Sequence, residues 1–190
     1  MKKAKRELIL EAAVHVFSSK GYHNARMEAI AAVAGIGKGT IYEYFPSKLQ
    51  LFQDMLNKSL QVYYQNFNPE EMKQLSVEQR LCIIFETHIK FCRDNKDLTR
   101  LVFWDSDIFD EELREWLYTQ RQEKEERVLE IIEEGMARGE LRELDPMLVK
   151  VLLTGSVAAM WAPITLDGWE IAPEVLARDV TDILMNGLKK

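Results

Sequence analysis

Residues 38–45, with the sequence KGTIYEYF, contain side chains suited to contact with nucleic acid. Lys38, Thr40, Tyr42 and Tyr44 share the outward face of a short predicted helix that follows a glycine-containing turn. A tyrosine ring can touch a thymine methyl while its hydroxyl reaches a phosphate, and the amides at a helix start favour an anion. The alternative is that both tyrosines are ordinary surface aromatics.

Three short helices are expected to position this face. The first covers about residues 4–20 and ends at Gly21, since glycine accepts a positive φ. The second covers about 27–34 and the third about 38–44, with a turn over residues 34–37 between them. We expect residues 30, 31 and 34 to pack on the first helix, with Ile41 and Phe45 closing a small core. This is the layout of a helix-turn-helix DNA-binding module.

The charge distribution supports the same interpretation. The net charge of −6 is unfavourable for a nucleic-acid binder when it is averaged over 190 residues. Residues 1–50, however, hold eight Lys/Arg against four Asp/Glu, whereas residues 51–190 hold seventeen against twenty-seven. A small basic module is therefore joined to a larger acidic one, and a positive face attracts the phosphate backbone.

Over residues 9–52 the sequence resembles the DNA-binding domain of TetR-family transcriptional regulators. The resemblance is carried by matches in register, among them Gly21-Tyr22, Ile30-Ala31, Ala34-Gly35, Lys38-Gly39-Thr40-Ile41-Tyr42-Glu43-Tyr44-Phe45, Ser47-Lys48 and Leu51-Phe52. Residues 53–190 match the family only in length, helical content and a Gly135…Gly139-Glu140-Leu141 turn.

The resemblance implies a homodimeric repressor whose third helix enters the major groove of double-stranded operator DNA, and whose larger domain binds a small molecule that releases the DNA. By position, Lys38, Gly39, Thr40 and Tyr42 would meet bases or nearby backbone, and Tyr44 and Lys48 would hold phosphates. Two positions depart from the pattern. Arg26 replaces the usual threonine or serine cap of the second helix but could still reach a phosphate, and Gly37 replaces a common serine.

The remaining chain is also predicted to be helical, because its apolar residues recur at three and four positions rather than alternating. A fourth helix follows Pro46-Ser47, and later helices are expected at about 76–92, 97–104, 110–137, 146–162 and 174–188. Ser76 and Gln79 have the spacing of a capping box, and Asp145 before Pro146 is an expected N-cap. The prediction is an all-α protein with a DNA-binding domain at 1–48 and a helical ligand-binding and dimerisation domain at 49–190.

The larger domain contains many big apolar side chains with few polar groups beside them. For any single residue the simpler interpretation is core packing, but as a group they could line an apolar cavity between helices for a small, largely apolar effector. His88 and Trp161 could orient that ligand through hydrogen bonds, although His88 is equally well explained as a core histidine. The candidate ligand-binding residues are Phe85, His88, Phe91, Phe103, Trp104, Trp116, Met160 and Trp161.

Two segments are candidates for a homodimer interface. Residues 146–162 are apolar on nearly all sides, so this helix should be buried either in its own domain or between subunits. The last predicted helix carries an apolar stripe beside polar residues. A dimer is also favoured because one helix-turn-helix covers few base pairs. The candidate interface residues are Val157, Val175, Val180, Ile183 and Leu184.

Other classes of protein are disfavoured. The segment 37–40, GKGT, lacks the preceding strand of a phosphate-binding loop, and the three histidines have no metal-ligand spacing, so we expect neither an enzyme nor a metal or other cofactor. Two cysteines are too few for a disulfide framework. No window is expected to approach the length of a membrane span, and the N-terminus lacks an apolar signal core, so the predicted location is the cytoplasm. An adaptor acting through protein contacts remains the main alternative.

Overall fold

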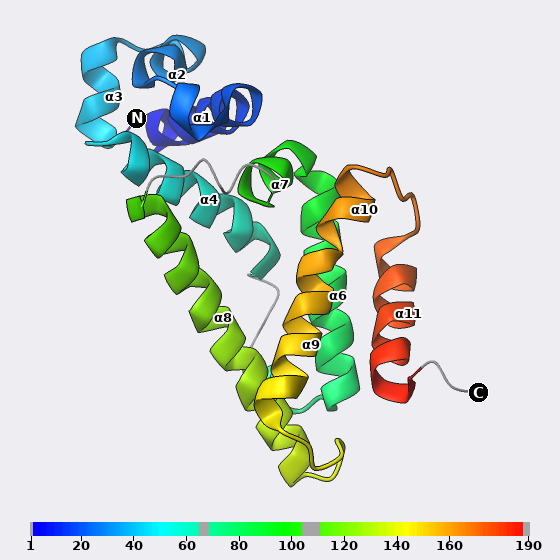
Figure 1. The fold of residues 1–190 in the computed structure, drawn as a ribbon. Coiled ribbons are helices and arrows are strands. Elements are labelled where there is room, and N and C mark those ends of the chain that lie inside the picture. Colours follow the sequence, from blue (N-terminus) through cyan, green and yellow to red (C-terminus); the bar gives the residue numbers. More distant parts are fainter. Residues whose placement is uncertain (1, 65–68, 104–110, 188–190) are drawn as a thin grey trace. The chain divides into compact units, whose positions relative to one another are not determined.

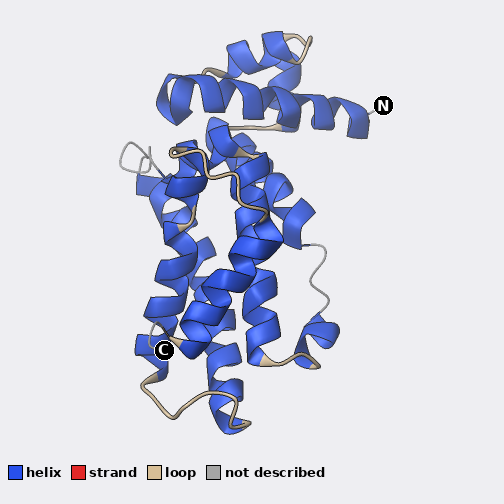
Figure 2. Ribbon diagram, turned by 90° about the vertical axis from the view of Figure 1, so that its right-hand side faces the viewer, coloured by secondary structure: helices blue, strands red, loops and turns tan. Residues whose placement is uncertain are grey.

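The computed structural model describes residues 2–64, 69–103 and 111–187, and every regular element within these ranges is a helix (Figures 1 and 2). The all-α prediction is therefore confirmed. The chain divides into two compact units. One comprises residues 1–62 and 95–114, and the other comprises 63–94 and 115–190. The predicted domain boundary lies at residue 48, directly after the DNA-binding module. The first compact unit is larger than this module, because it also contains most of the fourth helix and residues 95–114.

The first unit is built around the helix-turn-helix. Its helices are α1 (Lys2–Asn24), α2 (Met27–Val33), α3 (Lys38–Tyr44), α4 (Lys48–Tyr64) and α7 (Lys96–Phe103). Helix α1 was predicted to end at Gly21; it is interrupted there by a kink, where φ is +72°, and continues to Asn24. Helix α7 packs against α1.

An aromatic cluster joins α1 to α4 in the first unit. The Phe17 ring stacks on Tyr22 with centroids 5.8 Å apart, and both rings meet Phe52 edge-on at 5.1 Å. Phe17 and Phe52 are fully buried. Ion pairs between Arg6 and Asp54 (2.7 Å) and between Glu7 and Lys58 add a polar rim to the same contact. The cluster therefore holds α4 against the supporting helix of the DNA-binding module.

The second unit contains α5 (Pro69–Lys73), α6 (Val77–Asp94), most of α8 (Glu111–Ala137), α9 (Pro146–Ala159), α10 (Trp161–Thr165) and α11 (Pro173–Asn186). Helices α6 and α11 lie side by side (Figure 1) and are antiparallel, because Lys90 near the end of α6 pairs with Glu174 at the start of α11, at 3.1 Å. The short helices α5 and α10 were not predicted from the sequence.

Local signals place the helix ends in this unit as expected. The Gln79 amide donates to Ser76 Oγ at 3.2 Å, and the Ser76 amide donates to Gln79 Oε1 at 3.0 Å, which is a capping box. Asp145 accepts from the Met147 amide at 2.9 Å as the N-cap of α9. These contacts involve residues only two or three positions apart, which is why the sequence predicted them.

A buried arginine fixes the start of α6 against the end of α8. The Arg80 side chain is 4% exposed and donates to the carbonyls of Lys73 (2.8 Å) and Leu75 (3.1 Å) and to the Glu134 carboxylate (2.6 Å). The hydrogen bond from Arg80 lowers the pKa of Glu134. The Val77 amide donates to Glu140 at 2.6 Å, which lowers the pKa of that carboxyl. Backbone amides and carbonyls that have no partner within their own helix are thus hydrogen-bonded by charged side chains far away in the sequence.

The apolar helix α9 is not buried in its own unit, contrary to one of the two alternatives drawn from its composition. Leu153 is buried in a cluster with Val77, Leu81 and Ile132. Four other large apolar side chains of α9 lie outside this cluster and are 51–60% exposed. They are Met147, Leu148, Val151 and Leu152.

The expectation that no window approaches the length of a membrane span was wrong. Residues Pro146–Thr165 are long and apolar enough by composition to cross a membrane. This stretch comprises two helices, since α9 ends at Ala159 and α10 begins at Trp161. Helix α9 alone, with 14 residues, is about 21 Å long, which is less than the roughly 30 Å of a hydrocarbon core.

Candidate functional site

The turn between α2 and α3 has the geometry of a helix-turn-helix. Gly35 lies in the turn with φ +66°, and the Ile36 amide donates to the Ala31 carbonyl at 3.0 Å. Ile30 on α2 and Ile41 on α3 are fully buried, and Phe45 closes the core beneath α3. This packing leaves one side of α3 at the surface. The predicted small core is therefore present, except that Ala34 is only half-buried.

The predicted DNA-contacting residues of α3 differ in exposure. The Lys38 side chain is 67% exposed and Tyr42 is 43% exposed, while Gly39 has open space where a β-carbon would stand. Thr40 and Tyr44 are half-buried, so they face outward less than the sequence suggested. The structure brings all five onto a helix of seven residues, with Lys38 and Tyr42 one turn apart on its exposed side.

An ion pair that sequence reasoning missed spans the turn. Glu28, in the first turn of α2, accepts from the Lys38 ammonium at 2.7 Å. This hydrogen bond lowers the pKa of Glu28 and raises that of Lys38. The two residues are ten positions apart and on different helices, so no helical periodicity links them. An acidic residue near the start of the second helix was the only available signal.

The two positions that depart from the family pattern make no side-chain cap hydrogen bond. Arg26 is the N-cap of α2, is exposed and has extended backbone, and its side chain makes no cap hydrogen bond. Gly37 is the N-cap of α3 and has no side chain to contribute. The Arg26 charge contributes to the low pKa of Glu28, which places a further cation near the turn.

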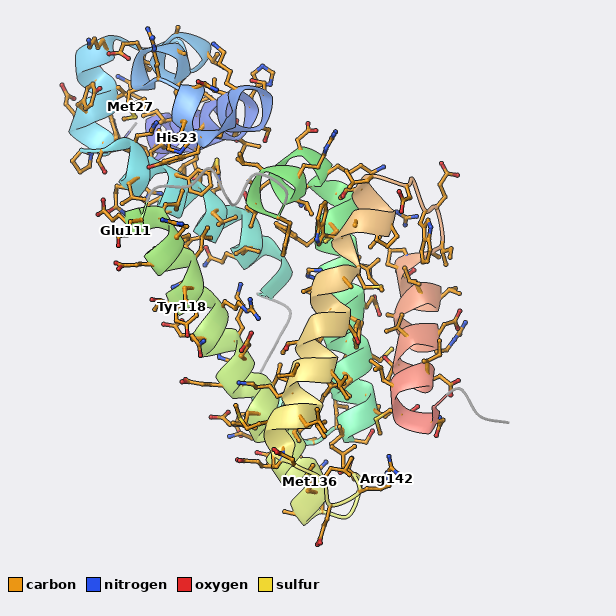
Figure 3. All side chains as sticks on the ribbon, viewed as in Figure 1. His23, Met27, Glu111, Tyr118, Met136 and Arg142 are labelled. Atoms are coloured by element: carbon orange, nitrogen blue, oxygen red, sulfur yellow. The ribbon has the colours of Figure 1, made fainter. Side chains whose placement is uncertain are left out.

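Lys48 has a structural role that the sequence did not indicate. Its ammonium donates to the carbonyls of Tyr22 (2.9 Å) and His23 (3.2 Å) and lies 4.5 Å from the centre of the Tyr22 ring. His23, labelled in Figure 3, stands at the end of α1. A cation is favourable at a helix C-terminus, where carbonyls lack partners. Lys48 thus ties the first turn of α4 to the end of α1.

The candidate ligand-binding residues fall in both units. Phe85 and Phe91 on α6 are buried, and α6 packs against α10, which begins at Trp161. His88, Trp116, Met160 and Trp161 are half-buried in the second unit. Phe103 is half-buried in the first unit, and Trp104 lies outside the described residues.

His88 is an electrically neutral group in this unit. Burial and, secondarily, the positive charge of Lys124 lower the pKa of His88 to about 4. Burial also lowers the pKa of Lys124. His88 Nε2 lies 3.5 Å from the Cys92 thiol one turn along α6. At pH 7 the imidazole is therefore uncharged and suited to hydrogen bonding with an uncharged polar group.

The candidate dimer-interface residues differ in how exposed they are. Ile183 is 45% and Val175 is 37% exposed, whereas Val157 and Val180 are half-buried. Leu184 packs against the buried cluster of its own chain. Helix α9, whose segment the sequence named as a candidate interface, carries four further exposed apolar side chains that the sequence did not name individually, Met147, Leu148, Val151 and Leu152.

Comparison with known proteins agrees with the geometry of the first unit. Residues 9–55 match the family model of bacterial regulatory proteins of the tetR family, and residues 74–188 match the tetracyclin repressor-like C-terminal domain. The "Fatty acid metabolism regulator protein" of Bacillus subtilis (strain 168) is 23% identical over 98% of this chain and 97% of its own length.

Solved structures share the whole fold. FadR from Bacillus subtilis in complex with stearoyl-CoA superposes with a TM-score of 0.83 at 22% identity, covering 96% of this chain and 99% of that one. AibR in complex with isovaleryl coenzyme A and operator DNA superposes with a TM-score of 0.73 at 18% identity, covering 95% and 98%.

A helix-turn-helix followed by a larger helical domain defines a DNA-binding transcriptional regulator rather than an enzyme. The family models cover both parts of the chain, and the second alone spans more than half of it. The chain belongs to the TetR family of transcriptional regulators, as the resemblance predicted.

Proposed function

We propose that this protein is a cytoplasmic, homodimeric repressor that binds its operator through α3 and releases it when an acyl-CoA binds the second unit. The observation that carries the proposal is the helix-turn-helix whose α3 exposes Lys38 and Tyr42 at the surface. Binding of an effector needs a coupling free energy of about 1–3 kcal/mol to change operator affinity by about 5–150-fold.

In the proposed complex Lys38, Gly39, Thr40 and Tyr42 approach bases or nearby backbone. Tyr44, Arg26 and Lys48 approach phosphates at the edge of the same groove. Lys48 already donates to the carbonyls of Tyr22 and His23, so in the proposed complex a phosphate has to compete with these carbonyls for its ammonium. Lys38→Ala should weaken operator binding by about 1–3 kcal/mol, a loss comparable to one mismatched base pair.

The acyl-CoA is proposed from two lines of support. The second unit contributes large apolar side chains, including Phe85 and Phe91, together with the neutral His88. Two similar structures are complexes with acyl-CoA molecules, one with a long straight acyl chain and one with a short branched one. An acyl chain supplies apolar surface for such residues, and its thioester carbonyl is an uncharged acceptor for a polar side chain.

The second copy is proposed to cover the exposed face of α9. Leaving this face in water is unfavourable, since apolar surface gains about 25 cal/mol per Å² on burial. Val151 is 60% exposed, so Val151→Glu should give monomers in sedimentation, while Leu8→Glu, a change at another exposed apolar residue on α1, should leave the dimer intact. A Val151→Glu protein that still sediments as a dimer would place the interface elsewhere.

The experiment that tests the function is release of DNA by defined ligands. A duplex selected from a random-sequence library by the purified protein is the probe, and stearoyl-CoA, isovaleryl-CoA, free coenzyme A and free stearate are added separately. The expected result is release by at least one acyl-CoA and none by coenzyme A alone. Release by no acyl-CoA would refute the effector class. Failure to select any duplex would favour the adaptor alternative.

A further inference from the structure

The Glu28–Lys38 pair lies on the part of the molecule proposed to meet DNA. Glu28 is in the first turn of α2, and Lys38 is the first residue of α3. The Lys38 Nζ atom lies 2.7 Å from Glu28 Oε1, across the turn between the two helices. Tyr42 is one turn further along α3, is exposed, and adds to the rise in the Lys38 pKa. A carboxylate, an ammonium and a phenol are thus adjacent at one end of the proposed recognition surface.

The Glu28–Lys38 ion pair adds little to the folding stability of the protein. The side chains of Lys38 and Glu28 are 67% and 47% exposed, and exposed ion pairs contribute little to folding. Lys38 also stands at the N-terminus of α3, where the helix dipole disfavours a cation. A carboxylate at a surface that approaches phosphates repels them, so Glu28 lowers the affinity for any duplex unless its charge serves recognition.

The pair instead restricts what Lys38 can do. A lysine on four rotatable bonds reaches many phosphates equally well, which adds affinity without sequence information. Glu28 holds the Lys38 ammonium beside the start of α3, at 2.7 Å, which restricts the positions that the ammonium can reach. At a sequence without a suitable acceptor on the base edge, Lys38 stays with Glu28 and contributes nothing to binding.

We propose that Glu28 is a specificity-determining positioning residue, which directs Lys38 to a base acceptor and weakens binding to non-operator DNA. This inference rests on the proposed role of Lys38 in DNA binding. Removing the carboxylate charge should release Lys38 for phosphate contacts, so that non-specific affinity rises more than operator affinity.

The test uses the full-length wild-type protein and the variants Glu28→Gln, Lys38→Ala and the double variant. Each is titrated with the duplex selected by the wild-type protein and with a scrambled duplex, at several salt concentrations. Glu28→Gln should bind the scrambled duplex about fivefold more tightly, with the salt slope steeper by about one, and its preference for the operator should fall about fivefold. In the Lys38→Ala background, the same change should tighten both duplexes equally, and by no more than Glu43→Gln does in the wild-type background.

Glu43→Gln is the matched control, because Glu43 is an exposed carboxylate on α3 itself. It reports what the loss of one negative charge does without releasing Lys38. Equal tightening of both duplexes by Glu28→Gln, or the same tightening without Lys38, would show a general charge effect and overturn the inference. If Lys38→Ala weakens operator binding while Glu28→Gln changes nothing, only the role of Glu28 fails. If Lys38→Ala changes neither duplex, the role of Lys38 fails as well.

Discussion

His88 should make the stability of the protein depend on pH in a way that one substitution removes. The pKa of His88 is about 4 in the folded protein, mainly because burial disfavours the charged imidazole, against 6.5 for an unperturbed histidine. Above pH 6.5 the residue is neutral in both the folded and the unfolded chain, and its contribution is constant. As the pH falls below 6.5, the unfolded chain takes up a proton that the folded chain does not, so the free energy of unfolding decreases until about pH 4.

The size of this effect follows from the two pKa values. Each pH unit between them corresponds to about 1.36 kcal/mol, so His88 should cost about 3 kcal/mol of stability between pH 7 and pH 4. For a protein stabilised by about 5–15 kcal/mol, such a loss is large. Replacement by glutamine keeps a hydrogen-bonding group of similar reach but cannot take up the proton.

The assay is urea denaturation at intervals between pH 4 and pH 7.5, compared between the wild-type protein, His88→Gln and His15→Gln. Carboxyl groups titrate in the same range, so the informative quantity is the difference between proteins at each pH. His88→Gln should lose about 3 kcal/mol less than the wild type on acidification. His15→Gln is the control, because His15 is exposed on α1 and the variant keeps His88. Parallel curves for wild type and His88→Gln would refute the reasoning.

Three further substitutions test the contacts that organise the two units. Lys48→Met should lower the free energy of unfolding by about 1–3 kcal/mol, through loss of two carbonyl hydrogen bonds and the Tyr22 contact, as measured by urea denaturation. Gly135→Ala should lower the melting temperature, because its β-carbon would stand 2.5 Å from Val77 Cγ2, and overpacking of about 1–3 kcal/mol exceeds a helix-propensity gain of about 1 kcal/mol. Arg80→Met should cost about 1–3 kcal/mol in urea denaturation, since it removes the donor to the Glu134 carboxylate and leaves Arg138 as the remaining side-chain donor to the Lys73 and Leu75 carbonyls.

Each of these three predictions would be contradicted by a particular result. A Lys48→Met protein with unchanged stability but a reduced salt slope in DNA binding would assign the residue to phosphate contact instead. A higher melting temperature for Gly135→Ala would show that Val77 moves aside at little cost. Equal stability of Arg80→Met and the wild type would mean that Arg138, together with water, suffices as donor to the Lys73 and Leu75 carbonyls.

Most of the fold could be predicted from the sequence because helices leave local signals. The apolar stripe of α1, the break at Gly21 and the caps at Ser76 and Asp145 involve residues within a few positions of one another. The helix-turn-helix was predicted for the same reason. The helices α5 and α10 were missed because five residues are too few for a periodic pattern.

Less of the candidate site could be predicted. The sequence identified Lys38 and Tyr42 as exposed residues of α3, and the structure agrees. It did not reveal that Lys38 is paired with Glu28, because that contact depends on the angle between two helices. It also attributed Lys48 to phosphate on resemblance alone, whereas in the structure its ammonium contacts the carbonyls that end α1.

The sequence by itself determined the helical class, the helix boundaries that caps and glycines mark, and the family, since all three depend on residue types in short registers. Tertiary structure decided which charges meet. Arg80 is buried where α8 brings Glu134 to it, and α9 buries Leu153 in the core while its opposite apolar side stays exposed. Contacts between residues 54 positions apart are set by packing of whole helices, which no local pattern encodes.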